Sequence, residues 1–225
     1  MKNQRIFISG IDTDCGKTYI TGLLAYHFRK AGINCVTTKF VQTGCLGISD
    51  DILEHRRIME VDVLPEDKSG LTCPFVYSFP ASPHLSAKID KRNFSFDKLS
   101  EFISNLLEKF ELVLIEGAGG LTVPITDEVL TSDYLIENQQ PIVLVSSSKL
   151  GSINHTLLSI DFCIKNWINL IAVIYNQFPD DDVEIAIGTY KFLEKRLKCN
   201  YPGIKLIHGD DLQKENDINI VDLIL

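Results

Sequence analysis

Gly10-Ile11-Asp12-Thr13-Asp14-Cys15-Gly16-Lys17-Thr18 lies between an apolar run at residues 5–9 and a stretch whose apolar residues recur at helical spacing. Strand, glycine-containing loop and helix in this order are typical of a phosphate-binding loop, in which backbone N–H groups and the helix N-terminus hold the anion. In such a loop Lys17 reaches the outer phosphates, and the Thr18 hydroxyl is a ligand of Mg²⁺. The segment therefore predicts a nucleotide site with a magnesium ion.

The spacing of the two glycines departs from the common form of this loop. Residues 11–15 place five residues between them, whereas the common form has about four. A Gly-Lys-Thr that merely opens a helix is the alternative interpretation, and the apolar run before it favours the phosphate loop. The motif predicts a nucleotide and is silent on how the nucleotide is used.

Length and composition limit the classes of protein to consider. With 225 residues, of which 45% are hydrophobic, the chain is long enough for one domain, 1–225, with a large buried core. Its net charge of −8 argues against a nucleic-acid partner, because a phosphate backbone needs a basic surface. No apolar run approaches the ~18 residues of a membrane span. We therefore expect a cytoplasmic protein with neither nucleic acid nor membrane as a partner.

The cysteines and histidines predict no metal site of their own. The six cysteines have irregular spacings without a C-x-x-C, which favours free thiols in a reducing compartment over disulfides or zinc. The five histidines form neither H-x-x-x-H nor H-E-x-x-H, so a histidine metal site has no support.

Strand-like apolar runs alternate with helical patterns along the chain, which predicts one doubly wound α/β domain with a parallel sheet. The expected strands are 5–9, 34–39, 112–115, 141–145, 170–175 and 204–207, with a short one at 75–77. The expected helices are 50–60, one beginning after an N-cap at Ser95, 131–138, 153–166 and 182–198. The last should bury one face, made of Val183, Ala186, Ile187, Tyr190, Leu193 and Leu197.

Ligands of such sheets bind beyond the carboxyl ends of the strands, so polar residues there are candidates for chemistry. Glu116 ends an apolar run and precedes three glycines, a position from which a carboxylate can hold Mg²⁺. A charged residue that leaves a strand into a flexible turn is the alternative, and the phosphate loop in the same sheet favours the metal. Lys39 ends another strand, where its charge can stabilise a transferred phosphoryl group, although a strand-end lysine is ordinarily a surface residue.

Four further polar residues can be explained without a functional role. Asp50 and Asp51 begin a helix, where acidic residues need no function to explain them. Asn176 can bond a base edge, but asparagine is also common in turns. His84 is expected to be structural.

Several motifs together resemble dethiobiotin synthetase. They are the loop at 10–18, Lys39 with Gln42-Thr43-Gly44, Ser82-Pro83-His84, Glu116-Gly117-Ala118-Gly119-Gly120, Lys149-Leu150-Gly151 with Ile153-Asn154-His155, and Asn176. The resemblance implies an ATP- and Mg²⁺-dependent ligase of biotin synthesis with a phosphate-loop fold. It joins carbon dioxide to 7,8-diaminononanoate as a carbamate, phosphorylates the carbamate with ATP, and closes the ring to dethiobiotin with release of ADP and phosphate.

The resemblance also implies roles for individual residues. Lys17 and Lys39 are the catalytic residues, and Lys39 stabilises the carbamate and its phosphorylation. The nucleotide contacts are Thr13, Asp14, Cys15, Gly16, Lys17, Thr18, Tyr19, Asp50, Glu116, Gly117, Ala118, Gly119 and Asn176. The magnesium ligands are Thr18, Asp50 and Glu116, with Asp51 as the alternative to Asp50. Thr13, Lys39 and Thr43 contact the diamine, while Gly151 and Asn154 reach its carboxylate from a second subunit, which implies a homodimer.

Some positions depart from the family pattern. Ile11 replaces a usual threonine, Phe40 replaces a usual proline, and residues 207–210 lack the expected proline and apolar residues near the adenine. Three other interpretations stay open at this point. They are a dimerising phosphate-loop ATPase switch without a small substrate, a nucleotide-binding relative without activity, and an enzyme of another amide-forming class.

Overall fold

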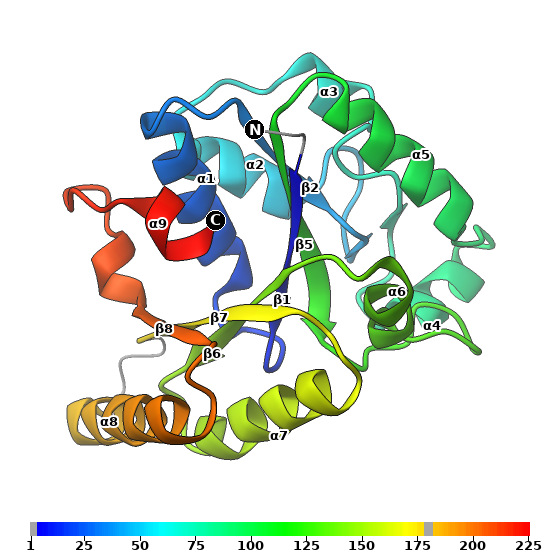
Figure 1. Cartoon of the computed structure of the whole chain (residues 1–225). Coiled ribbons are helices and arrows are strands. Elements are labelled where there is room, and N and C mark those ends of the chain that lie inside the picture. The colour runs from blue at the N-terminus through cyan, green and yellow to red at the C-terminus, as the bar shows by residue number, and fades with distance from the viewer. Residues whose placement is uncertain (1–3, 178–181) are drawn as a thin grey trace.

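A six-stranded parallel sheet forms the middle layer of the molecule, with the strand order β2-β5-β1-β6-β7-β8 (Figure 1). The computed structural model describes residues 4–177 and 182–225. The strands of this sheet are β1 (Gln4–Gly10), β2 (Cys35–Lys39), β5 (Leu112–Gly120), β6 (Ile142–Ser147), β7 (Leu170–Asn176) and β8 (Lys205–His208). A parallel pair, β3 (Gln42–Thr43) and β4 (Val76–Tyr77), makes a second small sheet. The predicted fold class, a doubly wound parallel sheet, is confirmed.

Helices cover both faces of the sheet. Their bounds are α1 (Lys17–Lys30), α2 (Asp50–Met59), α3 (Pro65–Lys68), α4 (Pro83–Ile89), α5 (Phe96–Leu107), α6 (Thr131–Asn138), α7 (Ser152–Lys165), α8 (Val183–Asn200), the 3₁₀ helix η1 (Gly209–Leu212) and α9 (Ile220–Ile224). None of the helices within these described ranges is long and apolar enough to cross a bilayer.

Two hydrophobic cores flank the sheet, one on each face. Strand β1 contributes to both, because alternate side chains of a strand point to opposite faces: Phe7 lies in one core, Ile6 and Ile8 in the other. The first core packs against α5, α6, α7 and α8, and the second against α1, α2, η1 and α9. Burial on both faces explains why the strands are continuous apolar runs.

Side chains outside the helices fix where several of them begin. The Ser95 hydroxyl accepts a hydrogen bond from the Lys98 N–H at 3.2 Å, which confirms the predicted N-cap of α5. The Asp182 carboxylate likewise accepts from the N–H groups of Glu184 and Ile185 at the start of α8.

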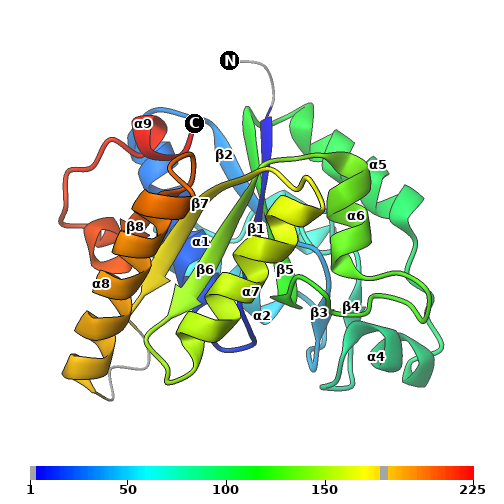
Figure 2. The same ribbon diagram turned by 60° about the horizontal axis from the view of Figure 1, so that its bottom comes forward.

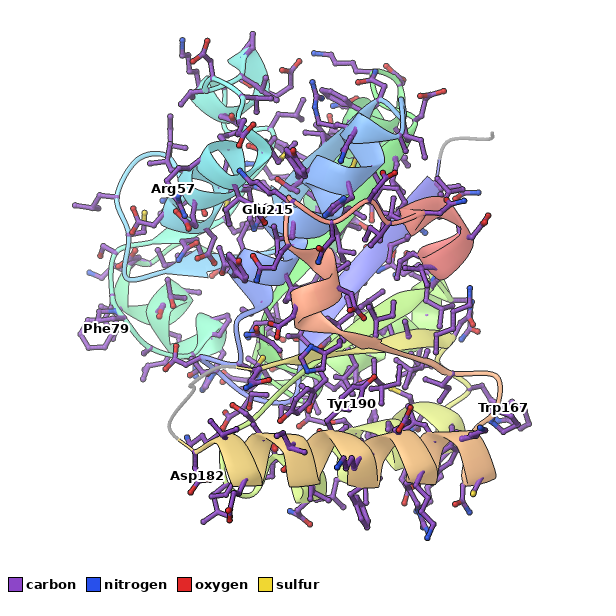
Figure 3. All side chains as sticks on the ribbon, turned by 90° about the vertical axis from the view of Figure 1, so that its left-hand side faces the viewer. Arg57, Phe79, Trp167, Asp182, Tyr190 and Glu215 are labelled. Atoms are coloured by element: carbon purple, nitrogen blue, oxygen red, sulfur yellow. The ribbon has the colours of Figure 1, made fainter. Side chains whose placement is uncertain are left out.

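The structure corrects two of the sequence expectations. Val183 and Ile187 of α8 are 59% and 47% exposed, so they do not belong to its buried face. Figure 3 shows Tyr190 on the side of α8 turned toward the sheet, where its ring lies 5.5 Å from that of Tyr175. Strand β5 does not end at Glu116 but continues to Gly120, which pairs with Gly10 of β1 after a register shift.

Short elements lie beyond the carboxyl ends of the strands, and one of them, β4, confirms the short strand predicted at 75–77. The small sheet of β3 and β4 and the helix α4 are close to the end of β5 (Figure 2). The sequence analysis did not predict β3 and α4, because elements this short show no periodicity. These elements lie beside the edge of the sheet that also carries the phosphate loop, and they enlarge the surface there.

A buried ion pair fixes α2 against β2. The Arg56 guanidinium donates to both carboxylate oxygens of Asp67, at 2.9 and 2.8 Å, and to the Thr37 hydroxyl at 2.8 Å. Both charged side chains are almost completely buried. The neighbouring Arg57 makes an exposed pair with Glu54 instead.

Replacing Arg56 by Met should lower the free energy of unfolding by about 3–5 kcal/mol, because the Asp67 carboxylate would stay buried without its partner. Urea denaturation of the purified variant measures this loss. The control is Arg57→Met, which removes an exposed pair and should change the free energy of unfolding far less. Equal losses in the two variants would contradict the assignment of the buried pair.

Candidate active site

The phosphate loop joins β1 to α1 at the carboxyl edge of the sheet. Its last residue before the helix, Gly16, has a φ of 88° and carries no side chain to cap α1, so the first N–H groups of the helix remain available to an anion. The Lys17 ammonium donates to the Asp12 carbonyl oxygen at 2.9 Å, and this bond bends the side chain back over the loop. The predicted strand–loop–helix arrangement is confirmed.

Asn176, at the end of β7, braces this loop. Its side-chain Nδ2 donates to the carbonyl oxygen of Cys15 at 3.0 Å. It also lies so close to Gly16 that a Cβ there would be 2.0 Å from Nδ2. Glycine is therefore required at position 16 both by its positive φ and by this close approach.

A fully buried carboxylate forms the centre of the site. Glu116 Oε1 accepts hydrogen bonds from the Thr18 hydroxyl at 2.9 Å and from the Lys39 ammonium at 2.8 Å. Its other oxygen, Oε2, is 2.6 Å from Nε2 of His55. Lys39 makes a second ion pair with Asp51. Charged and polar side chains from α1, β2, β5 and α2 thus meet at one point.

The charges of this cluster stabilise one another. Burial by itself raises the pKa of the Glu116 carboxyl, but the Lys39 ammonium and His55 outweigh this effect, so the pKa is held below its ordinary value. Burial likewise lowers the pKa of Lys39, and the carboxylates of Glu116 and Asp51 reverse the shift, so the pKa is raised. Both groups are therefore charged at neutral pH.

A cavity of about 940 Å³ opens over this cluster. Most of the residues that the sequence assigned to nucleotide, metal or diamine line it: Thr13, Asp14, Gly16, Lys17, Thr18, Tyr19, Lys39, Thr43, Glu116, Ala118 and Gly119. It is also lined by Val41, Gln42, Asp51, Glu54, Val123 and the segment 80–83. One end of the cavity is therefore charged, and Val41, Val123 and the two prolines add an apolar wall.

Two predicted nucleotide contacts lie behind this lining. Cys15 is buried, with Sγ 3.9 Å from the Lys17 ammonium. Gly117 is buried, and its carbonyl oxygen accepts from Lys39 at 3.1 Å. A Cβ at position 117 would be 2.7 Å from the Phe7 ring, so the close contact between β5 and β1 excludes larger residues.

The two neighbouring aspartates at the start of α2 have different surroundings. Asp50 is exposed and is not among the residues that line the cavity, whereas Asp51 lines it and pairs with Lys39. Adjacent side chains of a helix point about 100° apart, so only one of two neighbouring aspartates can face the site. Of the two aspartates named as possible metal ligands, Asp51 is therefore the one that lies beside Lys39 at the cavity.

Gly151 and Asn154 also lie apart from the main cavity. Both are exposed at the start of α7. Beside them is a separate hollow of about 200 Å³, whose lining includes Thr13, Lys149, Ser152 and His155. In the part of the chain that the structure describes, neither residue lines the cavity over the cluster around Glu116.

His55 is the residue of the site that sequence analysis missed. The chain contains no histidine motif, so a lone histidine in a helix gives little signal. The available clue is its position four residues after Asp51, which puts both side chains on one face of α2.

The donor set suits a magnesium ion. Thr18, Glu116 and Asp51 offer a hydroxyl and two carboxylates, and Mg²⁺ binds one or two carboxylates together with phosphate oxygens and water. No group of three or more His, Cys, Asp or Glu side chains within residues 4–177 and 182–225 is arranged to hold a metal ion. One hydroxyl and two carboxylates fit a Mg²⁺ ion whose other ligands are phosphate oxygens and water.

Fold and site define a phosphate-loop nucleotide-binding protein. A family model described as an AAA domain matches residues 4–209. A putative plasmid partition protein of Borrelia burgdorferi, solved with bound AMPPNP, has a TM-score of 0.54 and 15% identity, covering 99% of this chain and 98% of its own. The structure of pNOB8 ParA has a TM-score of 0.54 and 12% identity, covering 99% and 80%. At such identities the likeness shows the fold alone.

Sequence comparison narrows the class to one family. The ATP-dependent dethiobiotin synthetase BioD 2 of Haemophilus ducreyi is 43% identical over 205 residues, which are 91% of this chain and 97% of the relative. The BioD 2 protein of Pasteurella multocida is 47% identical over 196 residues, 87% and 92% of the two chains. The BioD protein of Chlorobaculum tepidum is 46% identical over 198 residues, 88% and 83%. The chain belongs to the dethiobiotin synthetase family, which confirms the resemblance seen in its motifs.

Replacing Gly16 by Ala should weaken ATP binding by more than about tenfold, because a Cβ with positive φ is strained and would displace Asn176. Equilibrium binding of a fluorescent ATP analogue measures the effect. Gly188→Ala is the control, since a Cβ at that position of α8 meets nothing within 4 Å. Unchanged affinity in Gly16→Ala would contradict the role of the loop.

The buried cluster around Glu116 should also make the free energy of unfolding decrease at acidic pH. Because the folded pKa of Glu116 lies below its unfolded value of about 4.3, its contribution to stability is present above that pH and is lost as the pH falls further. In Lys39→Met the pKa of Glu116 should rise, because its main counter-charge is gone.

The stability difference between wild type and Lys39→Met should therefore be large near neutral pH and shrink below about pH 4, where Glu116 is protonated in the variant. Urea denaturation across this range tests the sign. Lys88→Met, which removes an exposed pair with Asp127, should show a much weaker trend, because solvent screens that pair. A difference that grows on acidification would contradict the assignment.

Proposed function

We propose that this chain is an ATP-dependent dethiobiotin synthetase, a ligase of biotin biosynthesis. It joins 7,8-diaminononanoate and carbon dioxide to dethiobiotin, with ATP converted to ADP and phosphate. Family membership at 43–47% identity supports the reaction. The single observation that carries the proposal is the convergence of Lys17, Lys39 and Glu116 on one cavity.

The chemistry proceeds in three steps. One amine of the diamine adds to carbon dioxide and loses a proton, which gives a carbamate. A carbamate oxygen then attacks the γ-phosphorus of ATP, forming a mixed carbamic–phosphoric anhydride and ADP. The neighbouring amine attacks the carbonyl carbon, loses a proton and displaces phosphate, which closes the cyclic urea. Because both nitrogens belong to one molecule, ring closure needs only orientation.

We assign the phosphate and metal contacts to the charged end of the cavity. Lys17 and the N–H groups at the start of α1 bind the outer phosphates, and Thr13, Asp14, Tyr19, Ala118 and Gly119 border them. Thr18, Glu116 and Asp51 would hold Mg²⁺, which when bound offsets phosphate charge. Lys39 lies between two carboxylates, from which its ammonium can turn to the carbamate and to the transferred phosphoryl group.

The diamine is proposed to lie along the apolar wall. Thr13 and Thr43 line the cavity near its polar end, and Val41 and Val123 can pack against the methylene groups. The substrate carboxylate requires a positive partner. The N-terminus of α7, with Gly151 exposed and no side-chain cap, supplies N–H groups for a carboxylate.

We infer a homodimer in which this end of α7 completes the site of the second subunit. Gly151 and Asn154 are exposed and lie outside the cavity of their own subunit, which supports such an arrangement. Leu150, 82% exposed beside them, is available to an apolar contact between subunits. Residues 1–225 would act as one synthetase domain.

The nucleotide base and the location of the enzyme are part of the same proposal. We assign the adenine to the end of β7, where Asn176 keeps its Oδ1 for the base while Nδ2 holds the loop.

A cytoplasmic location supplies ATP and keeps the free cysteines reduced.

Lys39→Met should lower kcat for dethiobiotin formation by about 10²–10³-fold while nucleotide still binds, because the lost ammonium acts on developing charge. Product is measured by mass spectrometry after incubation with the diamine, bicarbonate, Mg²⁺ and ATP. Lys88→Met is the control and should retain wild-type turnover.

The same assay separates this function from that of an ATPase switch. ATP turnover by the wild-type protein should depend on the diamine and yield the cyclic urea. Turnover that is indifferent to the diamine, with no cyclic product, would favour the switch. A different amide product would indicate another ligase of the same fold class.

A further inference from the structure

Lys39 is the last residue of β2, which is an edge strand of the six-stranded sheet. The ladder holds an edge strand from one side only, so the end of such a strand has few constraints of its own. The Lys39 side chain nevertheless has to reach into the site, where its ammonium lies 3.1 Å from the Gly117 carbonyl oxygen. A contact beyond the ladder is therefore needed to keep the end of β2 in place.

The side chain that follows Lys39 lies on the opposite side of the chain. Lys39 and Val41 both line the active-site cavity, whereas Phe40 between them does not line it and is fully buried. Successive side chains of a strand alternate in this way, and the alternation continues here past the last residue of β2. A contact that fixes Phe40 therefore also fixes the direction in which Lys39 points.

The Phe40 ring packs among rings from three other parts of the chain. Its centroid lies 5.0 Å from that of Tyr134 on α6, 5.5 Å from that of Phe7 on β1, and 5.6 and 6.5 Å from those of Phe94 and Phe96 beside the start of α5. Most of these separations are in the range in which aromatic rings attract one another. We call these five residues the aromatic cluster.

The aromatic cluster also supports the strand that faces Lys39. The Phe40 N–H donates to the Glu116 carbonyl oxygen at 2.8 Å, which extends the ladder between β2 and β5 by one bond. A Cβ at Gly117 would lie only 2.7 Å from the Phe7 ring, so β5 is in close contact with the cluster as well. The cluster thus lies directly behind both strands whose ends form the site.

We propose that Phe40 is a positioning residue: its ring, held in the aromatic cluster, fixes the end of β2 so that the Lys39 side chain keeps its place in the cavity. The inference rests on the role in phosphoryl transfer proposed above for Lys39. It goes beyond that role because it assigns the placement of this lysine to a residue that does not line the cavity.

Phe40→Leu is the test variant, because leucine is apolar but cannot make the ring contacts. Its kcat per ATP-binding site should fall about 10–10²-fold, since a displacement of about 1 Å at a reacting group can cost this much. The KM for ATP should stay near the wild-type value, because the phosphate loop belongs to β1 and α1. ATP-binding sites are counted by titration with a non-hydrolysable analogue. A purely structural role would lower the number of sites and leave kcat per site unchanged, and this result would overturn the inference.

The matched control is Phe96→Leu. Phe96 belongs to the same cluster, with ring centroids 4.8 Å from Phe94 and 5.9 Å from Tyr134, but it begins α5 and does not line the cavity. This variant should lose stability while kcat per site stays near that of wild type. Equal losses of kcat per site in the two variants would contradict a specific role of Phe40.

Hydrogen exchange tests the positioning without any assay of activity. The N–H groups of Lys39 and Phe40 donate to the carbonyl oxygens of Thr72 and Glu116, at 2.7 and 2.8 Å, so both should be protected in the wild-type protein. In Phe40→Leu they should exchange about tenfold faster or more, while the amides of β7 keep their wild-type rates. Wild-type amides at 39 and 40 that exchange as fast as those of an exposed loop would overturn the inference even if the variants fail to fold.

Lys39→Met separates this inference from the proposed function. If Lys39→Met keeps the wild-type kcat, the proposed role of Lys39 fails and the inference about Phe40 fails with it. If Lys39→Met loses its turnover while Phe40→Leu keeps the wild-type kcat per site, the inference about Phe40 fails alone.

Discussion

A single carboxylate inside the sheet constrains the rest of this structure. Glu116 is fully buried on a central strand, and an unpaired charge in that place would cost several kcal/mol. Its compensation comes from Lys39 on β2, Thr18 on α1 and His55 on α2. The loop, the neighbouring strand and the second helix must therefore all be correctly placed before this residue is stable. The groups that we propose to bind and activate the nucleotide are thus part of the core.

The parallel sheet makes that convergence possible. Strand β5 lies between β1 and β2, so the ends of three strands meet at one edge. Lys39 and Glu116 are direct partners in the register of β2 and β5, although 77 residues separate them in sequence. Close approach of β5 to β1 is possible because position 117 is glycine. The site follows from strand order as much as from the identity of its residues.

Sequence reasoning succeeded where a short pattern also tells where a residue lies in the folded sheet. A residue that directly follows an apolar run in a parallel sheet lies at the ligand edge, which is why Lys39 and Glu116 could be placed from the sequence. Sequence reasoning failed where the rotation of a helix about its own axis decides which of its side chains face the sheet or the cavity. Whether Asp50 or Asp51 faces the cavity depends on the phase of α2, and the burial of Val183 depends on the tilt of α8 against the sheet. Neither quantity is encoded in a short pattern.

The sequence by itself determined the fold class, the phosphate loop and the family. These depend on short segments and on their spacing along the chain, which is the same before and after folding. Only the tertiary structure decided that Asp51 pairs with Lys39, that Asn176 braces the loop, and that His55 contacts Glu116. The physical reason is the short range of hydrogen bonds and ion pairs. They form between atoms about 3 Å apart, and such distances exist only after α2, β5 and β7 have packed together.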